Sequence, residues 1–535
     1  MRPPIVDHCP SVKFMFLNGV KTRSLTPFQR QGAADRKSNL LRSVFIVWGA
    51  FLAAIGLFLW LDGIFEGVGG NYYLIPWAFA TGIVVLIPII YQFIKGTFDP
   101  FHPLVFASWS YFFPGFAIGG LVLALGYSQP FYLSFVMDEH YNLPLTFLYV
   151  MLGFGGLTAG FIIPFAGHAG QRIAKRLPVW NWKPEQVLKP GLILLAIGLG
   201  NSALGFASGI LGFQRIEEIG KFDGIIILFS MLWLLASFLL WLAIFRSEKL
   251  GVVHYAVIAI LLISSISRSA YQGNRGGLVS VFMLIAFAYV CSGKKIGPRQ
   301  TLAGGGLIVI TLIVGMIYGT TFRAVKETSD RVDMDKYAGV IGDAVSTISD
   351  QDLVANLSTG FAALGERLDS ISPLAVVVSN YEKLGPYEEA YGLSNNIVND
   401  TVAFMIPRVI WEDKWLASDA SKYGDLYFNF PNNSFTLTPM GDLLRNFGPW
   451  GVPLGMILLG FILRIIYTAL RGDQPFSFWR AGLFYMLLST VSYEGSYALI
   501  IPTFFKVGFI AVMGILLVRF IAGRGQADNP AEARA

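Results

Sequence analysis

The sequence predicts an all-α polytopic membrane protein. Its 535 residues are 54% hydrophobic and only 14% charged, whereas soluble domains carry about a quarter charged residues. Most of the chain consists of apolar runs of ~20 residues, the length that a helix needs to cross the hydrocarbon core of a bilayer. Between two of these runs, over residues 322–450, no segment is long and apolar enough to cross. We therefore expect a bundle of transmembrane helices with one large water-facing insert.

The apolar runs predict about twelve spans. They are continuous, unlike the alternating strands of a membrane barrel, so their backbone groups must be satisfied within helices. The runs begin near Val44, Tyr72, Pro103, Leu145, Pro190, Gly224, Gly251, Gly277, Thr301, Trp450, Phe478 and Pro502.

The basic residues predict the orientation of the spans. They gather before the first span and in alternate loops, for example at Lys175 and Lys294, whereas residues 61–71 and 127–144 contain no Lys or Arg. Basic residues in short loops mark the cytoplasmic side, so both termini are expected there. The predicted layout is a cytoplasmic tail over residues 1–43, spans one to nine over 44–320, an outer insert of short helices over 321–448, spans ten to twelve over 449–522, and a cytoplasmic tail over 523–535.

Two arginines on the predicted outer side are exceptions to this charge rule. Arg268 and Arg275 belong to a loop rich in Ser and Gly, just before a helix predicted to begin at Gly277. The N-terminus of a helix favours anions, and the fork of arginine suits phosphate oxygens. The loop therefore indicates a phosphate site. The alternative is a tight turn whose arginines reach lipid headgroups.

The insert carries two further arginines in distinctive surroundings. Arg367 lies between the carboxylates of Glu366 and Asp369, which suits either a site or a solvated ion pair. Arg408 follows Pro407 and precedes Trp411 and Glu412, a combination that suits a sugar with a nearby phosphate or, alternatively, an interfacial anchor.

Asp442 and Arg445 stand just before the tenth predicted span. They are three residues apart and so share one helical face. Asp442 is a candidate general base, and it is equally a candidate ion-pair partner that holds Arg445. Glu494 and Lys506, near the last two spans, are further charges close to the membrane. They are expected to pair with each other or to face a cavity, and the alternative is that both lie at the interface.

The sequence predicts no metal and no other cofactor. Two Asp-x-Asp matches, at Asp333 and Asp350, are expected by chance in an Asp-rich insert. No histidine lies in the insert, which excludes a histidine base there, and the two cysteines indicate no disulfide framework.

Four short motifs, taken in order, resemble a known family. They are the turn Gly273-Asn274-Arg275-Gly276, the segment from Glu366 to Ser370, Ile406-Pro407-Arg408 with Trp411, and Met440-Gly441-Asp442 followed by Asn446-Phe447-Gly448. In these motifs the chain resembles the bacterial Wzy-type oligosaccharide repeat-unit polymerases, the O-antigen polymerase-like family. The resemblance covers Ser264 to Tyr467.

The resemblance implies a GT-C-like glycosyltransferase of the bacterial inner membrane that uses no metal. Such an enzyme joins oligosaccharide units carried on undecaprenyl diphosphate, on the periplasmic side, with lipid diphosphate as the leaving group. Its partners would be the lipid-linked oligosaccharide, membrane lipid and, in the same pathway, a flippase and a chain-length regulator; a nucleic acid is not expected.

The same chemistry assigns roles to the residues singled out above. Cations must offset the charge of a diphosphate leaving group, and the candidates are Arg268, Arg275, Arg367, Arg408 and Arg445. A carboxylate must accept the proton of the attacking hydroxyl, and the candidates are Asp442, Glu366, Asp369 and Glu412. Trp411 and Glu412 are the candidates for sugar binding.

Two other functions stay open from the sequence. The related O-antigen ligases use a histidine in the large periplasmic loop, which the insert lacks. A transporter of lipid-linked glycan would carry its charges at the middle of the bilayer, whereas the arginines here are predicted at the outer surface.

Overall fold

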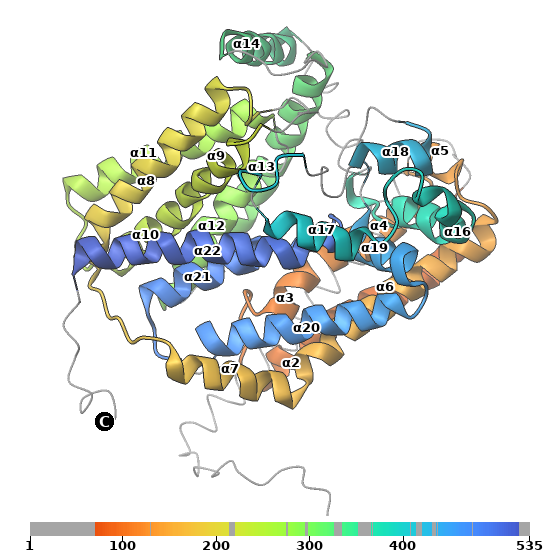
Figure 1. Ribbon diagram of the computed structural model, residues 1–535, viewed down its shortest axis with the longest axis horizontal. Coiled ribbons are helices and arrows are strands. Elements are labelled where there is room, and N and C mark those ends of the chain that lie inside the picture. The colour runs from red at the N-terminus through yellow and green to blue at the C-terminus, as the bar shows by residue number, and fades with distance from the viewer. Residues whose placement is uncertain are drawn as a thin grey trace, which may run out of the picture.

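The computed structural model describes residues 70–128, 130–212, 220–273, 277–294, 298–325, 334–350, 365, 367–406, 408–413, 420–430, 435, 437–472 and 474–523. Within these ranges every regular element is a helix (Figure 1). The helices are η1 (Tyr72–Leu74), α2 (Ile75–Lys95), α3 (Pro103–Ala107), the π-helical η2 (Ser108–Ile118), α4 (Gly119–Ala124), α5 (Pro130–Leu133), α6 (Glu139–Ile162), α7 (Pro164–Arg176), α8 (Pro184–Ala207), α9 (Asp223–Ser230), α10 (Leu232–Arg246), α11 (Val252–Gln272), α12 (Gly277–Cys291), α13 (Pro298–Val325), α14 (Met334–Asp350), α16 (Ile371–Glu388), α17 (Asn396–Met405), α18 (Ala420–Phe428), α19 (Thr438–Phe447), α20 (Gly451–Leu470), α21 (Phe478–Ser489) and α22 (Tyr497–Ala522).

Eight helical stretches in the described part of the chain are long and apolar enough to cross a membrane, which confirms the class of a polytopic all-α membrane protein. They are Tyr72–Lys95, Pro103–Ala124, Glu139–Ile162, Pro184–Ala207, Asp223–Arg246, Val252–Gln272, Thr438–Leu470 and Tyr497–Ala522.

The other four predicted spans have different outcomes. The run near Val44 lies outside the described residues. The run near Gly277 forms α12, which has 15 residues, and the run near Phe478 forms α21, which has 12. Both are shorter than the ~20 residues that cross a bilayer alone. The run near Thr301 lies in α13, whose apolar stretch Ile313–Phe322 is also short. The number twelve therefore stays a prediction.

The segment that begins at Ser264 differs from its prediction as an outer loop. Helix α11 continues through it to Gln272. The hydroxyl groups of Ser264 and Ser265 both donate to the carbonyl oxygen of Leu261, at 3.1 and 2.6 Å. Serine hydroxyls that bond in this way to the preceding turn do not end a helix, so the segment from Ser264 to Gln272 is helical.

Helices α6 and α20 pack with their backbones in contact, and they run side by side in Figure 1. A Cβ atom added at Gly160 would lie 2.0 Å from the carbonyl oxygen of Ile457, and one added at Gly460 would lie 2.1 Å from that of Leu157. Small residues allow this close approach between membrane helices. Because α20 follows α19 directly, this pair fixes the position of α19.

The connections between spans form two groups that lie at opposite ends of the helices. In one group, Arg471 forms an ion pair with Asp99 at 2.8 Å, and Arg246 donates to the carbonyl oxygen of Ser292 at 3.3 Å. We call these connections the basic side, because Arg176, Lys294 and other cations lie in the same loops.

The opposite end holds the described part of the insert, and we call it the insert side. Here Asn380 of α16 donates to the carbonyl oxygen of Phe135, and the hydroxyl of Ser128 donates to Asp369. Each of these contacts joins two connections on the same side of the bundle. Such contacts are expected if each long helix runs from one side to the other.

Candidate functional site

Four segments that are distant in sequence meet on the insert side. They are the segment from Arg367 through α16, helix α18, helix α19, and the connection from Thr490 to Ser496 that leads into α22. Helices α16, α18 and α19 lie together at the right of Figure 1, and α19 packs against both α16 and α22. Two of the motifs singled out in the sequence, around Arg367 and around Asp442, are therefore brought to one place.

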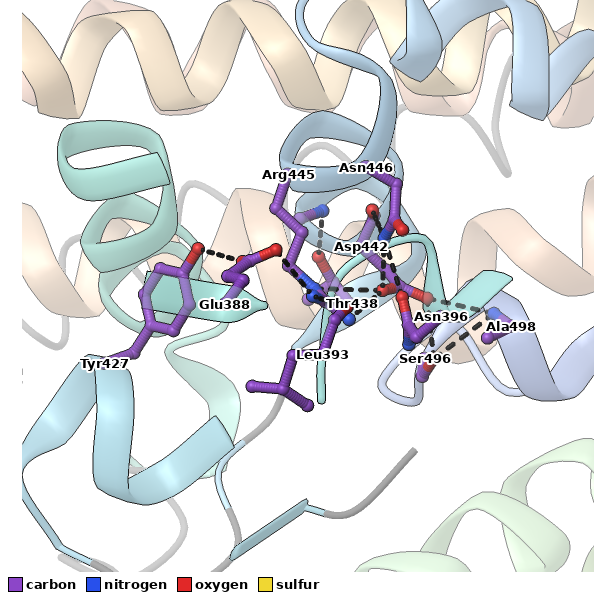
Figure 2. A network of polar contacts seen from close by, with 11 residues as sticks. Glu388, Leu393, Asn396, Tyr427, Thr438, Asp442, Arg445, Asn446, Ser496 and Ala498 are labelled. Carbon is purple, nitrogen blue, oxygen red and sulfur yellow. Dashed lines mark hydrogen bonds and ion pairs between the residues drawn. The ribbon is translucent and has the colours of Figure 1, made fainter. Parts of the chain in front are cut away.

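Asp442 of α19 is fully buried, and hydrogen bonds occupy both of its carboxylate oxygens (Figure 2). Its Oδ1 accepts from Arg445, with Nη2 at 2.9 Å and Nε at 3.1 Å, and from the amide of Asn446. Its Oδ2 accepts from the hydroxyl of Ser496 at 2.6 Å and from the backbone N–H of Ala498 at 2.9 Å. This geometry favours the ion-pair alternative over a general base.

Arg445 is equally enclosed, with 1% of its side chain exposed. Besides Asp442, its Nη1 donates to Glu388 Oε2 at 3.2 Å and to the carbonyl oxygen of Leu393 at 3.0 Å. A diphosphate at this guanidinium would have to displace protein acceptors. Arg445 therefore joins α19 to the C-terminal end of α16 and is not accessible to a diphosphate in this structure.

Glu388, at the end of α16, completes the buried cluster, and the sequence did not single it out. Its Oε1 accepts from the hydroxyl of Tyr427 at 2.7 Å. Burial raises the pKa of Glu388, although Arg445 and the hydrogen bond from Tyr427 oppose the rise. The cluster thus places two carboxylates, those of Asp442 and Glu388, around one guanidinium.

Asp369 has a structural position at the start of α16. Its Oδ1 accepts from the backbone N–H groups of Ile371 and Ser372, both at 3.0 Å, and its Oδ2 accepts from the hydroxyls of Ser372 and Ser128. These bonds satisfy free N–H groups of the first helical turn. Burial raises the pKa of Asp369, and the hydrogen bonds oppose that effect. With both oxygens occupied, Asp369 holds the beginning of α16 in place.

Close packing against the membrane span Pro103–Ala124 positions the residue next to Arg367. A Cβ atom added at Gly119 would lie 2.0 Å from the carbonyl oxygen of Leu368. The backbone N–H of Ser370 donates to the carbonyl oxygen of Gly115 at 3.0 Å. The segment that carries Arg367 therefore lies directly on a helix backbone.

Arg367 itself is exposed, in contrast to Arg445. Its side chain is 53% exposed, and its Nη2 lies 2.7 Å from Oε2 of Glu494, whose side chain is 40% exposed. This pair is the exposed part of the site. The sequence suggested Lys506 as a partner of Glu494, whereas the ion pair of Glu494 in the structure is with Arg367.

A strained backbone holds the connection that carries Glu494. Thr438 has a φ of 58°, a left-handed conformation that is unfavourable for a β-branched residue. Its backbone N–H donates to the carbonyl oxygen of Glu494 at 3.3 Å, and its side-chain oxygen accepts from Gly441 N–H at 3.2 Å. The start of α19 and the connection before α22 are thereby fixed to each other.

The remaining predicted residues lie elsewhere or outside the described residues. Arg268 donates to the hydroxyl of Ser202 at 2.6 Å and lies over the ring of Trp233 at 5.1 Å, so it joins α11 to α8 and α10. Arg275 and Glu366 lie outside the described residues.

The segment around Arg408 forms its own local contacts. Arg408 donates to the carbonyl oxygen of Glu412 at 3.0 Å, and the carboxylate of Glu412 pairs with Lys221 at 3.3 Å. Trp411 is half-buried beside them. This segment therefore contacts the connection that precedes α9.

The residues that the sequence did not reveal are Glu388, Tyr427 and Ser496. Glu388 contacts Arg445, Ser496 contacts Asp442, and Tyr427 contacts Glu388. All three belong to segments that are distant in sequence from the residues they contact. No spacing rule connects such residues, so their contacts could not be predicted from the sequence.

Over the residues described, no group of three or more His, Cys, Asp or Glu side chains has the arrangement of a metal site. No protein-family model, curated protein or solved structure matches the chain.

Proposed function

We propose that this protein is a glycosyltransferase that polymerises oligosaccharide repeat units carried on undecaprenyl diphosphate. The observation that carries the proposal is the exposed guanidinium of Arg367, which lies where two of the resemblance motifs meet on the insert side. An exposed arginine beside a membrane span suits a lipid-linked diphosphate, because its fork binds phosphate oxygens in pairs.

The charge distribution supports a periplasmic location for this site. Cations such as Arg176, Arg246 and Lys294 lie on the basic side, and basic loops stay in the cytoplasm. The insert side then faces the periplasm of a bacterial inner membrane, where lipid-linked repeat units would be joined.

The cation set of the proposal is narrower than the one predicted from sequence. Arg367 is the principal diphosphate ligand, and Arg275 and Arg408 remain candidates. Arg445 and Asp442 do not contact the diphosphate but hold the surrounding helices in position. Arg268 remains a candidate at the outer end of α11, where a hydroxyl and an aromatic ring are its described partners.

The test is reconstitution of the purified protein in liposomes with an undecaprenyl-diphosphate-linked oligosaccharide. We expect a ladder of products that differ by one repeat unit, formed equally in EDTA, and a loss of that ladder in Arg367→Ala. Release of lipid diphosphate must accompany each addition. Transfer only to a different acceptor would favour a ligase, and movement of the lipid across the bilayer without a new glycosidic bond would favour a transporter; either result overturns the proposal.

A further inference from the structure

We propose that Glu494 is the catalytic carboxylate of the site, the group that accepts the proton of the attacking sugar hydroxyl. The inference rests on the proposed function and adds to it a residue that was not among its candidate bases. It follows from which carboxylates are accessible, from the partner of Glu494, and from how its backbone is held.

Accessibility separates Glu494 from the other described carboxylates of the site. Asp369 and Asp442 are buried, and hydrogen bonds occupy all of their oxygens. Glu388 is buried between Tyr427 and Arg445. A general base must reach within ~3 Å of the proton that it removes, and an acceptor sugar cannot approach these three groups without dismantling the cluster.

The ion pair between Glu494 and Arg367 can be broken when substrate binds. In the described structure the side chain of Glu494 pairs with Arg367, the same group that would bind the diphosphate. A diphosphate offers several anionic oxygens to the guanidinium and competes with a single carboxylate. Binding of the lipid diphosphate to Arg367 therefore frees Glu494 at the moment when a base is required.

The backbone around Glu494 is held more firmly than its exposed side chain suggests. Its carbonyl oxygen accepts from the strained Thr438, and Ser496, two residues later, donates to the buried Asp442. Tyr493 beside it is also buried. The enclosed cluster thus serves as the rigid support that a catalytic side chain requires.

The proposed step is balanced without a metal. The hydroxyl oxygen of the acceptor sugar forms a bond to the anomeric carbon of the donor, and its proton moves to the carboxylate of Glu494. The bond between the anomeric carbon and the phosphate oxygen breaks, and its electron pair leaves with the lipid diphosphate held by Arg367.

The experiment compares Glu494→Gln with Glu389→Gln, a matched change of an exposed glutamate at the end of α16. Polymerisation and binding of undecaprenyl diphosphate are both measured in liposomes. We expect Glu494→Gln to lower kcat by about 10²–10⁴-fold, the usual contribution of a general base. Because Arg367 no longer has a competing carboxylate, the affinity for undecaprenyl diphosphate should stay the same or rise by up to about fivefold. Glu389→Gln should change neither quantity.

The outcomes separate this inference from the proposed function. If the unaltered protein forms no polymer, the proposed function fails. If it does, and Glu494→Gln keeps more than a tenth of its kcat, Glu494 is not the base. Weaker diphosphate binding in Glu494→Gln, or its disappearance from the membrane, would also overturn the inference, because either result assigns Glu494 a structural role.

Discussion

Arg445 and Asp442, one turn apart on α19, form an ion pair at 2.9 Å in which neither side chain exposes more than 1% of its surface. A buried pair adds little net stability by itself, because both charges leave water. Here its importance is positional, since Glu388 of α16 and the start of α22 bind to the same two side chains. One buried contact thus fixes three helices relative to one another.

Removal of the buried guanidinium should destabilise the protein. Arg445→Met leaves the carboxylates of Asp442 and Glu388 without their cation, and breaking a buried pair costs about 3–5 kcal/mol. We expect a lower unfolding temperature in detergent and less protein in the membrane. Arg367→Met is the matched control, because an exposed pair contributes only about 0.2–1 kcal/mol. Equal stability of the two variants would contradict the assigned role of Arg445.

Removal of the exposed guanidinium should affect activity and leave the fold intact. Arg367→Ala is expected to lower the polymerisation rate by about 10²–10³-fold, the cost of losing one donor to developing charge. Arg367→Lys should retain partial activity, because it keeps the charge and loses the fork. The length of the polymer and the amount of membrane protein are measured together. A normal polymer in Arg367→Ala would exclude this arginine from diphosphate binding.

The contact between α6 and α20 should not tolerate a single added methyl group. Gly160→Ala would place its Cβ 2.0 Å from the Ile457 carbonyl oxygen, and such overpacking costs about 1–3 kcal/mol. Gly155 lies on the same helix with no atom of another residue near its would-be Cβ. Gly155→Ala should therefore leave the unfolding temperature unchanged. If the two variants unfold alike, the helices do not pack as closely as described.

Glu388 should make stability depend on pH. Its pKa is raised in the folded protein above the ordinary value of 4.5, so the folded state holds a proton that the unfolded chain releases. This contribution is greatest below pH 4.5 and is lost as the pH rises through the pKa of the folded state. Glu388→Gln stays neutral at every pH. Its unfolding temperature relative to the native protein should rise as the pH rises from 4.5 through the pKa of folded Glu388, whereas that of Glu389→Gln should show no such trend.

The two sides of the helical bundle should differ in accessibility from outside the cell. Tyr387 is exposed on α16 of the insert side, and Lys249 is exposed on the basic side. In intact cells, a membrane-impermeant maleimide should label Tyr387→Cys and spare Lys249→Cys until the membrane is opened. The opposite labelling pattern would reverse the proposed orientation.

Hydropathy predicted the long helices well because a run of ~20 apolar residues is a local property. Hydropathy predicted helix length less reliably where that length depends on packing against neighbouring helices. The run at Phe478 forms only the 12-residue α21. The serines near Ser264 suggested a loop, although their hydroxyls bind within the helix.

The candidate site was predictable only in part. The spacing of Asp442 and Arg445 indicated an ion pair, because helical geometry determines which residues share a face. Their contacts with Glu388 and Ser496 depend on how separate segments pack, which no local pattern encodes. For the same reason the sequence did not distinguish the exposed Arg367 from the enclosed Arg445, although both lie beside acidic residues.

The dependence of Asp442 on Ser496 and Ala498 also has a consequence for biosynthesis. The chain is made from its N-terminus, so α19 enters the membrane before the donors that Asp442 requires have been synthesised. Until α22 arrives, one oxygen of Asp442 lacks the two hydrogen bonds that it accepts in the finished protein. The native surroundings of Asp442 are therefore complete only after the last helix of the chain has been made.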